Sequence, residues 1–203
     1  MKSLSEIDTI AKRASKAIGF SWGISEEVGK NMRILEIFGL PGIKNLTDYY
    51  KNKKENNYEN LNIISQDNKS SKNHICPIIA GISFLDQIKN LENLKEIKFE
   101  KIAYPILFLP FVSRASEVVG KRLFAKFDEK EFLLNFNHNI YSNFLKKEIV
   151  NVSNVVTVKF IENSDSFLEN EWNDLYKLSE ETFVEENESL KKTGAGAGLT
   201  DND

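Results

Sequence analysis

The chain has 203 residues, of which 41% are hydrophobic and 28% are charged, enough to bury the core of one domain or of a domain with a small lobe. Its net charge of −3 argues against nucleic acid as the main partner, because no global basic field would attract phosphates. The single cysteine, Cys76, excludes an intramolecular disulfide, and no apolar segment approaches the length of a membrane span. With a polar start and no signal peptide, the protein is expected in the cytoplasm, away from membranes.

The first part of the chain, residues 1–50, predicts a helical lobe. Apolar residues recur at helical spacing over 3–18, behind a capping pattern of Ser and Glu. A second helix is expected over 25–38, after a short aromatic loop that contains Trp22, and a third over 43–50.

Residues 51–73 are nearly all polar and predict a solvent-exposed connection to the α+β body, residues 74–190. The body is expected to start with a helix over 78–90, because apolar residues recur there at helical spacing behind a proline. A strand over 75–82 is the alternative, since β-branched residues are dense. The continuous apolar run 104–108 predicts a buried strand.

The rest of the body predicts strands and then a helix. A hairpin is expected from 118–127 and 131–136, a further strand over 155–160, and a helix over 167–182. The last segment, 191–203, is a glycine-rich acidic tail. This order of elements indicates an α+β fold with an N-terminal helical lobe, a central mainly antiparallel sheet, a C-terminal helix and a flexible tail.

A cluster of polar side chains provides the candidate ligand site inside the body. Ser113, Arg114, Ser116 and Glu117 follow the predicted buried strand directly after Pro110. Ligand sites often form beyond strand ends, and arginine can bind a carboxylate through two hydrogen bonds. An internal ion pair between Arg114 and Glu117, at helical spacing, is the alternative.

Other residues with reactive or aromatic side chains carry weaker signals. Trp22 could line a ligand pocket or act as a packing anchor. His74 and Cys76 could form a nucleophilic pair, but a thiol beside an apolar run is more often buried and inert. His138 is distant in sequence, and one Cys with two His gives too few ligands for zinc. We therefore expect neither a metal nor an organic cofactor.

The tail invites a functional interpretation because three of the ten glycines lie within five residues. The tail residues expected to contact a partner or a pocket are Gly194, Gly196, Gly198, Thr200, Asp201, Asn202 and Asp203. No helix can follow the glycines, which argues against a phosphate loop, and a metal at Asp201 and Asp203 would need further ligands. The remaining interpretations are an arm that inserts into a groove and a frayed terminus.

Two stretches of the chain carry a family resemblance. They are Gly19-Phe20-Ser21-Trp22-Gly23-Ile24-Ser25-Glu26-Glu27-Val28-Gly29 and a C-terminal part with Trp172, Leu175, Thr182-Phe183-Val184 and Gly194 through Asp203. With Pro110-Phe111 and Arg114, they are similar to an uncharacterised bacterial family, a domain of unknown function, over essentially the whole chain. Glu185 and Lys191–Lys192 stand where that family has Pro and Arg. The resemblance implies no assigned activity, but it does imply that the tail belongs to the natural protein.

Charge and tail together lead to two functional hypotheses. Residues 162–203 hold 12 Asp/Glu against 3 Lys, whereas residues 1–161 hold 24 Lys/Arg against 18 Asp/Glu. The preferred hypothesis is a binding or accessory subunit whose C-terminal arm engages a protein partner or a second copy. The alternative is a small-molecule enzyme without an organic cofactor, in which Arg114 binds an anionic substrate and the tail closes the pocket. The sequence leaves both open.

Overall fold

The computed structural model describes residues 2–53, 55–135, 139–162 and 164–182. The chain divides into two compact units, Met1–Asn163 and Ser164–Asp203. The elements described in the first unit are α1 (Leu4–Ala17), α2 (Trp22–Ile37), α3 (Gly42–Asn52), β1 (Asp67–Asn68), α4 (Pro77–Leu91), β2 (Glu96–Ala103), η1 (Pro105–Leu107), α5 (Leu109–Val119), β3 (Arg122–Phe127), β4 (Lys130–Leu134), β5 (Ile140–Ser142) and β6 (Val152–Ile161). Together they confirm the predicted α+β fold.

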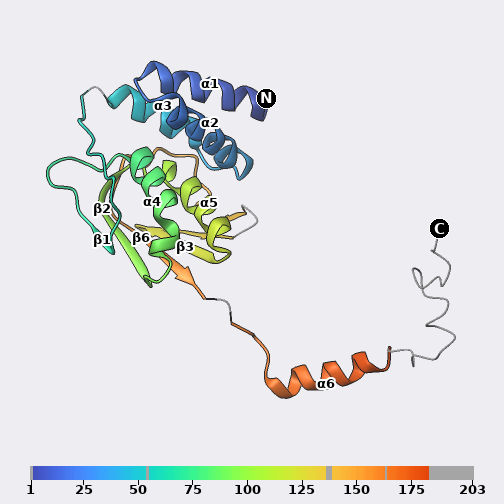
Figure 1. Cartoon of the computed structure of the whole chain (residues 1–203). Helices are drawn as coiled ribbons and strands as arrows, with labels where there is room; N and C mark the ends of the chain where they lie inside the picture. Colours follow the sequence, from blue (N-terminus) through green and yellow to red (C-terminus); the bar gives the residue numbers. More distant parts are fainter. Residues whose placement is uncertain (1, 54, 136–138, 163, 183–203) are drawn as a thin grey trace, which may run out of the picture. The chain divides into compact units, whose positions relative to one another are not determined.

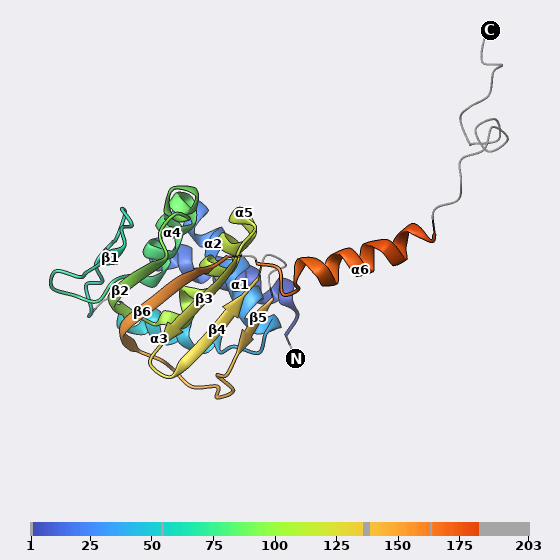
Figure 2. The ribbon, with the colours of Figure 1, turned by 90° about the horizontal axis from the view of Figure 1, so that it is seen from below.

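The strands of the first unit form one sheet in the order β1-β2-β6-β3-β4-β5. Among the described strands, β1 and β2 are parallel and the other neighbours are antiparallel, which confirms the expected mainly antiparallel sheet. Phe99, Ala125 and Val156 belong to the buried face of the sheet. Figure 1 shows α4 and α5 over this face, with α1, α2 and α3 beyond them. Figure 2 looks onto the opposite face, where the strands lie toward the viewer.

The predicted hairpin is formed by β3 and β4, which turn at Asp128. Asp128 has a φ of 50°, a left-handed conformation that a short Asp side chain tolerates. The first strand begins at Arg122 and not at residue 118 as expected, because α5 continues to Val119 and ends in a left-handed Gly120.

The N-terminal helices follow their capping residues. The Ser3 side chain accepts an N–H of the first turn of α1 at 3.1 Å, as the capping pattern predicts. The second helix was expected to begin at Ser25, and this was wrong by three residues. Ser21 caps α2 instead, with its Oγ accepting an N–H of the first turn at 3.3 Å, so Trp22 lies in the helix and not in a loop.

The structure also corrects two interpretations of apolar runs. The alternative strand over 75–82 is wrong, because Pro77 opens α4. The predicted strand over 104–108 is wrong too: Tyr104 is left-handed, with a φ of 44°, and Pro105 opens the short helix η1. The whole run is buried, and a run that is buried all round shows no period by which a strand could be told from a helix.

A close helix contact holds α4 against α5. Gly81 of α4 lies so near Phe111 of α5 that a Cβ at Gly81 would be 2.1 Å from the ring. Below this contact, Phe84 of α4, Phe99 of β2 and Phe108 pack edge to face, with ring centroids 4.9–6.2 Å apart. Glycine is thus required at position 81 for the close approach of α4 and α5.

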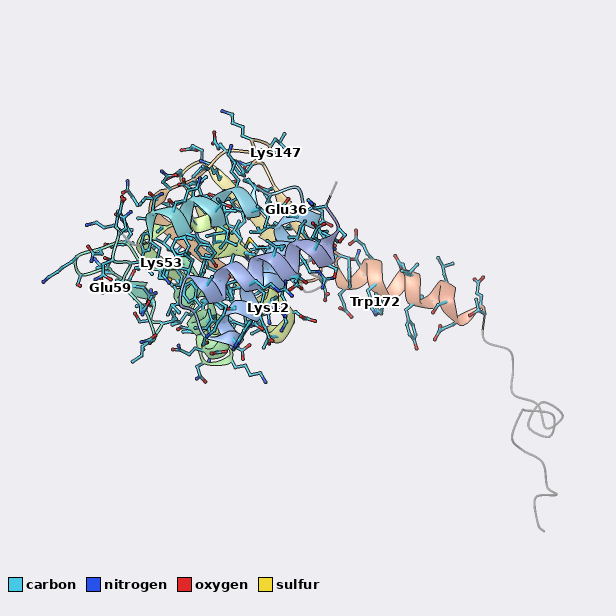
Figure 3. The ribbon with its side chains drawn as sticks, turned by 90° about the horizontal axis from the view of Figure 1, so that it is seen from above. Lys12, Glu36, Lys53, Glu59, Lys147 and Trp172 are labelled. Atoms are coloured by element: carbon cyan, nitrogen blue, oxygen red, sulfur yellow. The ribbon has the colours of Figure 1, made fainter. Side chains whose placement is uncertain are left out.

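The second unit contains α6 (Glu169–Glu180), which confirms the predicted C-terminal helix. None of its residues is buried, although its sequence has an apolar stripe. Trp172, labelled in Figure 3, is 48% exposed and stacks on Phe167 at 5.5 Å. The predictions made for residues 191–203 lie outside the described residues. In the part of the chain that the structure describes, no helix combines the length and apolar character that crossing a membrane requires.

Candidate functional site

The first unit contains a partly enclosed hollow of about 360 Å³, which we call the Tyr49 pocket. Its described lining residues are Gly19, Phe20, Ser21, Ile24, Tyr49, Lys53, Asn57, Tyr58, Asn60, Cys76 and Ile79. They come from the turn between α1 and α2, the start of α2, the end of α3, the following connection and the start of α4. Two other hollows of this unit have carboxylates in their lining, whereas no described residue of the Tyr49 pocket is acidic.

Local backbone geometry places the walls of the pocket. Gly19 ends α1 with a φ of 104°, a conformation that glycine adopts without strain, and this turn directs Phe20 into the core. On the opposite wall, the connection is fixed by backbone hydrogen bonds: the Cys76 N–H donates to the Glu59 carbonyl at 2.9 Å. The Glu59 carboxylate in turn accepts the Ser71 N–H, which lowers its pKa.

Two tyrosines, Tyr49 and Tyr58, line the pocket. Tyr49 is fully buried, stacks on Tyr58 with centroids 4.9 Å apart, and meets Tyr104 edge to face at 5.5 Å. The Tyr104 hydroxyl donates to Asp48 at 2.7 Å and accepts from the Asn52 amide at 3.0 Å. Burial raises the pKa of Tyr49, Tyr58 and Tyr104, so these hydroxyls keep their protons at neutral pH.

Cys76 immediately precedes α4 and is the thiol of this pocket. Its Sγ lies 3.1 Å from the Tyr49 hydroxyl. Burial raises the pKa of the Cys76 thiol and outweighs the opposite effect of the Tyr49 hydroxyl and of the first amides of α4. The thiol is therefore protonated at neutral pH, as expected for the inert cysteine predicted from the sequence.

Lys53 brings positive charge to the pocket. It follows the last residue of α3, and its Nζ lies 3.6 Å from the centre of the Phe20 ring; Figure 3 labels it. Burial lowers the pKa of Lys53, with a smaller opposite effect from Cys76. Lys53 forms no ion pair with any described residue. The pocket thus combines aromatic walls with a half-buried cation that pairs with no carboxylate among the described residues, which favours an anionic ligand.

The candidate cluster predicted after Pro110 has a different setting from the one expected. It lies within α5 and not beyond a strand end, because Pro110 stands in the first turn of that helix. The Arg114 side chain is 22% exposed and pairs with Glu27 of α2. Burial raises the Glu27 pKa, but hydrogen bonds from Lys30 and Arg114 outweigh it, and the pKa is lowered.

The neighbours of Arg114 point in different directions. Ser113 is fully buried, and its hydroxyl has no hydrogen-bond partner among the described residues. Ser116 is also buried and donates to the Lys121 carbonyl at 2.5 Å, which ties down the end of α5. Glu117 is exposed. The structure therefore does not bring these four side chains together around a common hollow among those described above.

The remaining sequence candidates lie in separate places. Trp22 is exposed, with the Lys16 ammonium 5.5 Å from its ring, and it is absent from the described lining of the Tyr49 pocket. His74 lies two residues before Cys76 and is half-buried, whereas His138 lies outside the described residues. Among the residues that are described, no group of three or more His, Cys, Asp or Glu side chains could hold a metal ion.

Sequence reasoning missed most of this pocket. Tyr49 lies in the predicted third helix but was not singled out, and Lys53, Asn57, Tyr58 and Asn60 fall in a segment interpreted as an exposed connection. The sequence did contain one signal: Tyr58 is an aromatic residue in a segment that is nearly all polar. The composition of this segment suits a solvated loop, but backbone bonds to the start of α4 fix its place.

A family model matches the N-terminal part of the chain. Residues 2–76 match a family described as Protein of unknown function (DUF3726), which confirms the resemblance to an uncharacterised family for this part. No curated protein and no solved structure matches the chain. The matched stretch contains α1 to α3 and every described lining residue of the Tyr49 pocket except Ile79.

Proposed function

We propose that the protein acts in the cytoplasm by binding a small organic anion in the Tyr49 pocket. One observation carries the proposal: Lys53 is half-buried in a hollow whose described lining has no carboxylate, and it pairs with no described carboxylate elsewhere. A buried or half-buried cation normally has a counter-charge, and here a ligand would supply it. Phe20, Tyr49 and Tyr58 suit an aromatic or other flat apolar body.

The alternative hypothesis of a small-molecule enzyme would place its substrate in the same pocket. Arg114 is less suited to bind that substrate than Lys53, because Glu27 already neutralises it. The thiol of Cys76 is not activated as a nucleophile, since burial keeps it protonated. We therefore place anion binding first, whether or not a reaction follows.

Benzoate is a suitable probe, because it combines a carboxylate with one aromatic ring. Benzoate should raise the melting temperature of the full chain in proportion to its concentration, whereas benzamide, which has the same shape without the charge, should have little effect. Lys53→Met should weaken benzoate binding roughly tenfold or more, since a charge-assisted hydrogen bond contributes about 1.5–3 kcal/mol.

Lys51→Met is the matched control, because Lys51 is an exposed lysine in the last turn of the same helix. It should bind benzoate as the wild type does. If benzoate does not stabilise the wild type, or stabilises the Lys53→Met variant equally, the proposed anion site is wrong.

A second candidate function, a binding or accessory subunit acting through the C-terminal segment, is favoured by α6. Its apolar stripe, Leu168, Trp172 and Leu175, is exposed, and a helix of 12 residues is marginal in water without a surface to pack on. The second unit carries 11 Asp/Glu against 3 Lys, so its partner should present an apolar surface surrounded by Lys or Arg.

Self-association is the form of this function that can be tested first. Light scattering after gel filtration should show an oligomer for the wild type and a monomer for Trp172→Glu, with an unchanged melting temperature because Trp172 is not buried. Deletion of residues 194–203 tests the tail in the same way and should also abolish assembly. A wild-type protein that is monomeric at high concentration would rule out self-association.

A further inference from the structure

Lys53 differs from an ordinary surface lysine in the ring that its amine contacts and in the lowered pKa of that amine. Its amine lies against the Phe20 ring, and no described carboxylate is within ion-pair distance to hold the proton. Burial lowers the pKa of Lys53, so more of its amine is uncharged near neutral pH than in an exposed lysine.

We propose that Lys53 forms an imine with its ligand, so that the Tyr49 pocket receives small anionic carbonyl compounds such as 2-oxo acids. The inference rests on the proposed function, because it takes the anion-binding pocket as its starting point. It adds the chemical class of the ligand and a covalent step at a named atom, Lys53 Nζ.

The step balances without an oxidant or reductant. The Nζ lone pair attacks the carbonyl carbon, a C–N bond forms, and the carbonyl oxygen takes up a proton to become a hydroxyl. Nitrogen then releases a proton, the hydroxyl leaves as water with a second proton, and the C=N bond forms as a protonated imine. Release of the remaining N–H proton gives the neutral imine. One amine and one carbonyl compound thus give one imine and one water.

Two hydroxyls of the pocket can act on the carbonyl oxygen during this reaction. Tyr49 and Tyr58 line it, and both hydroxyls keep their protons at neutral pH, so that either can donate to the carbonyl oxygen. Phe20, Tyr49 and Cys76 are buried and contribute apolar surface to the walls of the pocket.

A positive charge can stay beside the ligand carboxylate both before and after the imine forms. An imine nitrogen can be protonated, and a protonated imine keeps a positive charge at the position of the original ammonium. A carboxylate next to the carbonyl carbon would remain beside that charge throughout. The described lining offers no acidic residue to compete with the carboxylate.

Reductive trapping tests the inference on the full chain. The protein is incubated with pyruvate and cyanoborohydride near neutral pH, and the modified lysines are identified by peptide mass spectrometry. Lys53 should be modified at least tenfold faster than Lys51, and benzoate should slow this reaction. Lys53→Arg should abolish the fast modification.

The outcomes separate the two proposals. Benzoate stabilisation and trapping at Lys53 are both measured on the wild type, so the anion site and the imine are tested separately. Modification spread over surface lysines according to their exposure, with Lys53 no faster than Lys51, would overturn the imine and leave anion binding intact. If the wild type does not bind benzoate, the anion-binding pocket on which both proposals depend is wrong.

Discussion

Replacing Gly81 by alanine should destabilise the first unit by a calculable clash. The new Cβ would lie 2.1 Å from Cδ2, 2.6 Å from Cγ and 2.7 Å from Cε2 of Phe111. The ring would have to move by about 1.3 Å to restore a contact of 3.4 Å, the short limit of ordinary van der Waals contact. Phe111 is 1% exposed, so the ring has little room to move.

The expected cost follows from two opposing terms. Overpacking in a dense core costs about 3 kcal/mol at the upper end of its usual range, and alanine gains about 1 kcal/mol over glycine in a helix. Gly81→Ala should therefore lose about 2 kcal/mol, which for a unit of this size lowers the melting temperature by about 4–8 °C. Urea unfolding followed by circular dichroism measures the loss.

A double-mutant cycle identifies the cause of that loss. Phe111→Leu removes the ring atoms that meet the new Cβ, so the double variant should be more stable than the sum of the two single effects predicts. Gly23→Ala is the control, because a Cβ at Gly23 of α2 would meet no neighbouring atom within 4 Å. This variant should lose no stability and should gain up to about 1 kcal/mol from helix propensity. Additive losses, or a Gly81→Ala protein as stable as the wild type, would refute the close approach of α4 and α5.

Three further predictions concern buried polar groups and the thiol. Asn45→Ala should cost about 2–3 kcal/mol of unfolding free energy, because the buried Asn45 amide forms hydrogen bonds with two backbone carbonyls and one backbone N–H. Ser113→Ala should be neutral or slightly stabilising, because it removes a buried hydroxyl that has no described hydrogen-bond partner. Urea unfolding measures both effects. The lowered Glu27 pKa means that its ion pair stabilises the fold fully above the ordinary carboxyl pKa of 4.5 and that this stability is lost as pH falls further. Glu27→Gln should therefore be about 1–3 kcal/mol less stable than wild type near pH 7, and the difference should shrink as pH falls below 4.5. Cys76, only 2% exposed, should react with iodoacetamide at least a hundredfold more slowly in the native protein than in urea, and equal rates would contradict its burial.

Local signals predicted most of the fold correctly. The Ser3 cap of α1, the proline at the start of α4 and the apolar periods of these two helices are properties of short segments. Helices α1, α3 and α4 lie close to where the sequence places them. Errors occurred where two local signals competed. Ser21 and Ser25 can both cap a helix, and the structure uses Ser21 because the turn after Gly19 brings it to the helix start.

The apolar run 104–108 shows a different limit. Its burial was predicted correctly, but its conformation was not, because a segment surrounded by core on all sides carries no periodic pattern. The left-handed Tyr104 and the prolines at 105 and 110 break the chain into turns there. Because of this error, the ligand cluster was predicted at the end of a strand, whereas it lies within a helix.

The pocket could not have been found from spacing along the chain, because a site is defined by which charges remain without a partner after folding. Arg114 was the natural candidate among the cations of this chain, yet its partner Glu27 lies 87 residues earlier and is brought to it by the packing of α2 on α5. Lys53 was one lysine among many in a polar segment. Its distinction is the absence of a described carboxylate partner, a property of the tertiary structure.

The two cations can therefore be compared directly as anion sites. Arg114→Met should leave benzoate binding unchanged while lowering the free energy of unfolding, because it leaves the Glu27 carboxylate without its pairing guanidinium. Lys53→Met should weaken benzoate binding and, in the absence of benzoate, should change the free energy of unfolding little, since Lys53 has no ion pair with a described residue to lose. Isothermal titration with benzoate and urea unfolding of both variants measure the two effects. The reverse pattern, with benzoate binding lost in Arg114→Met and retained in Lys53→Met, would move the anion site from the Tyr49 pocket to α5.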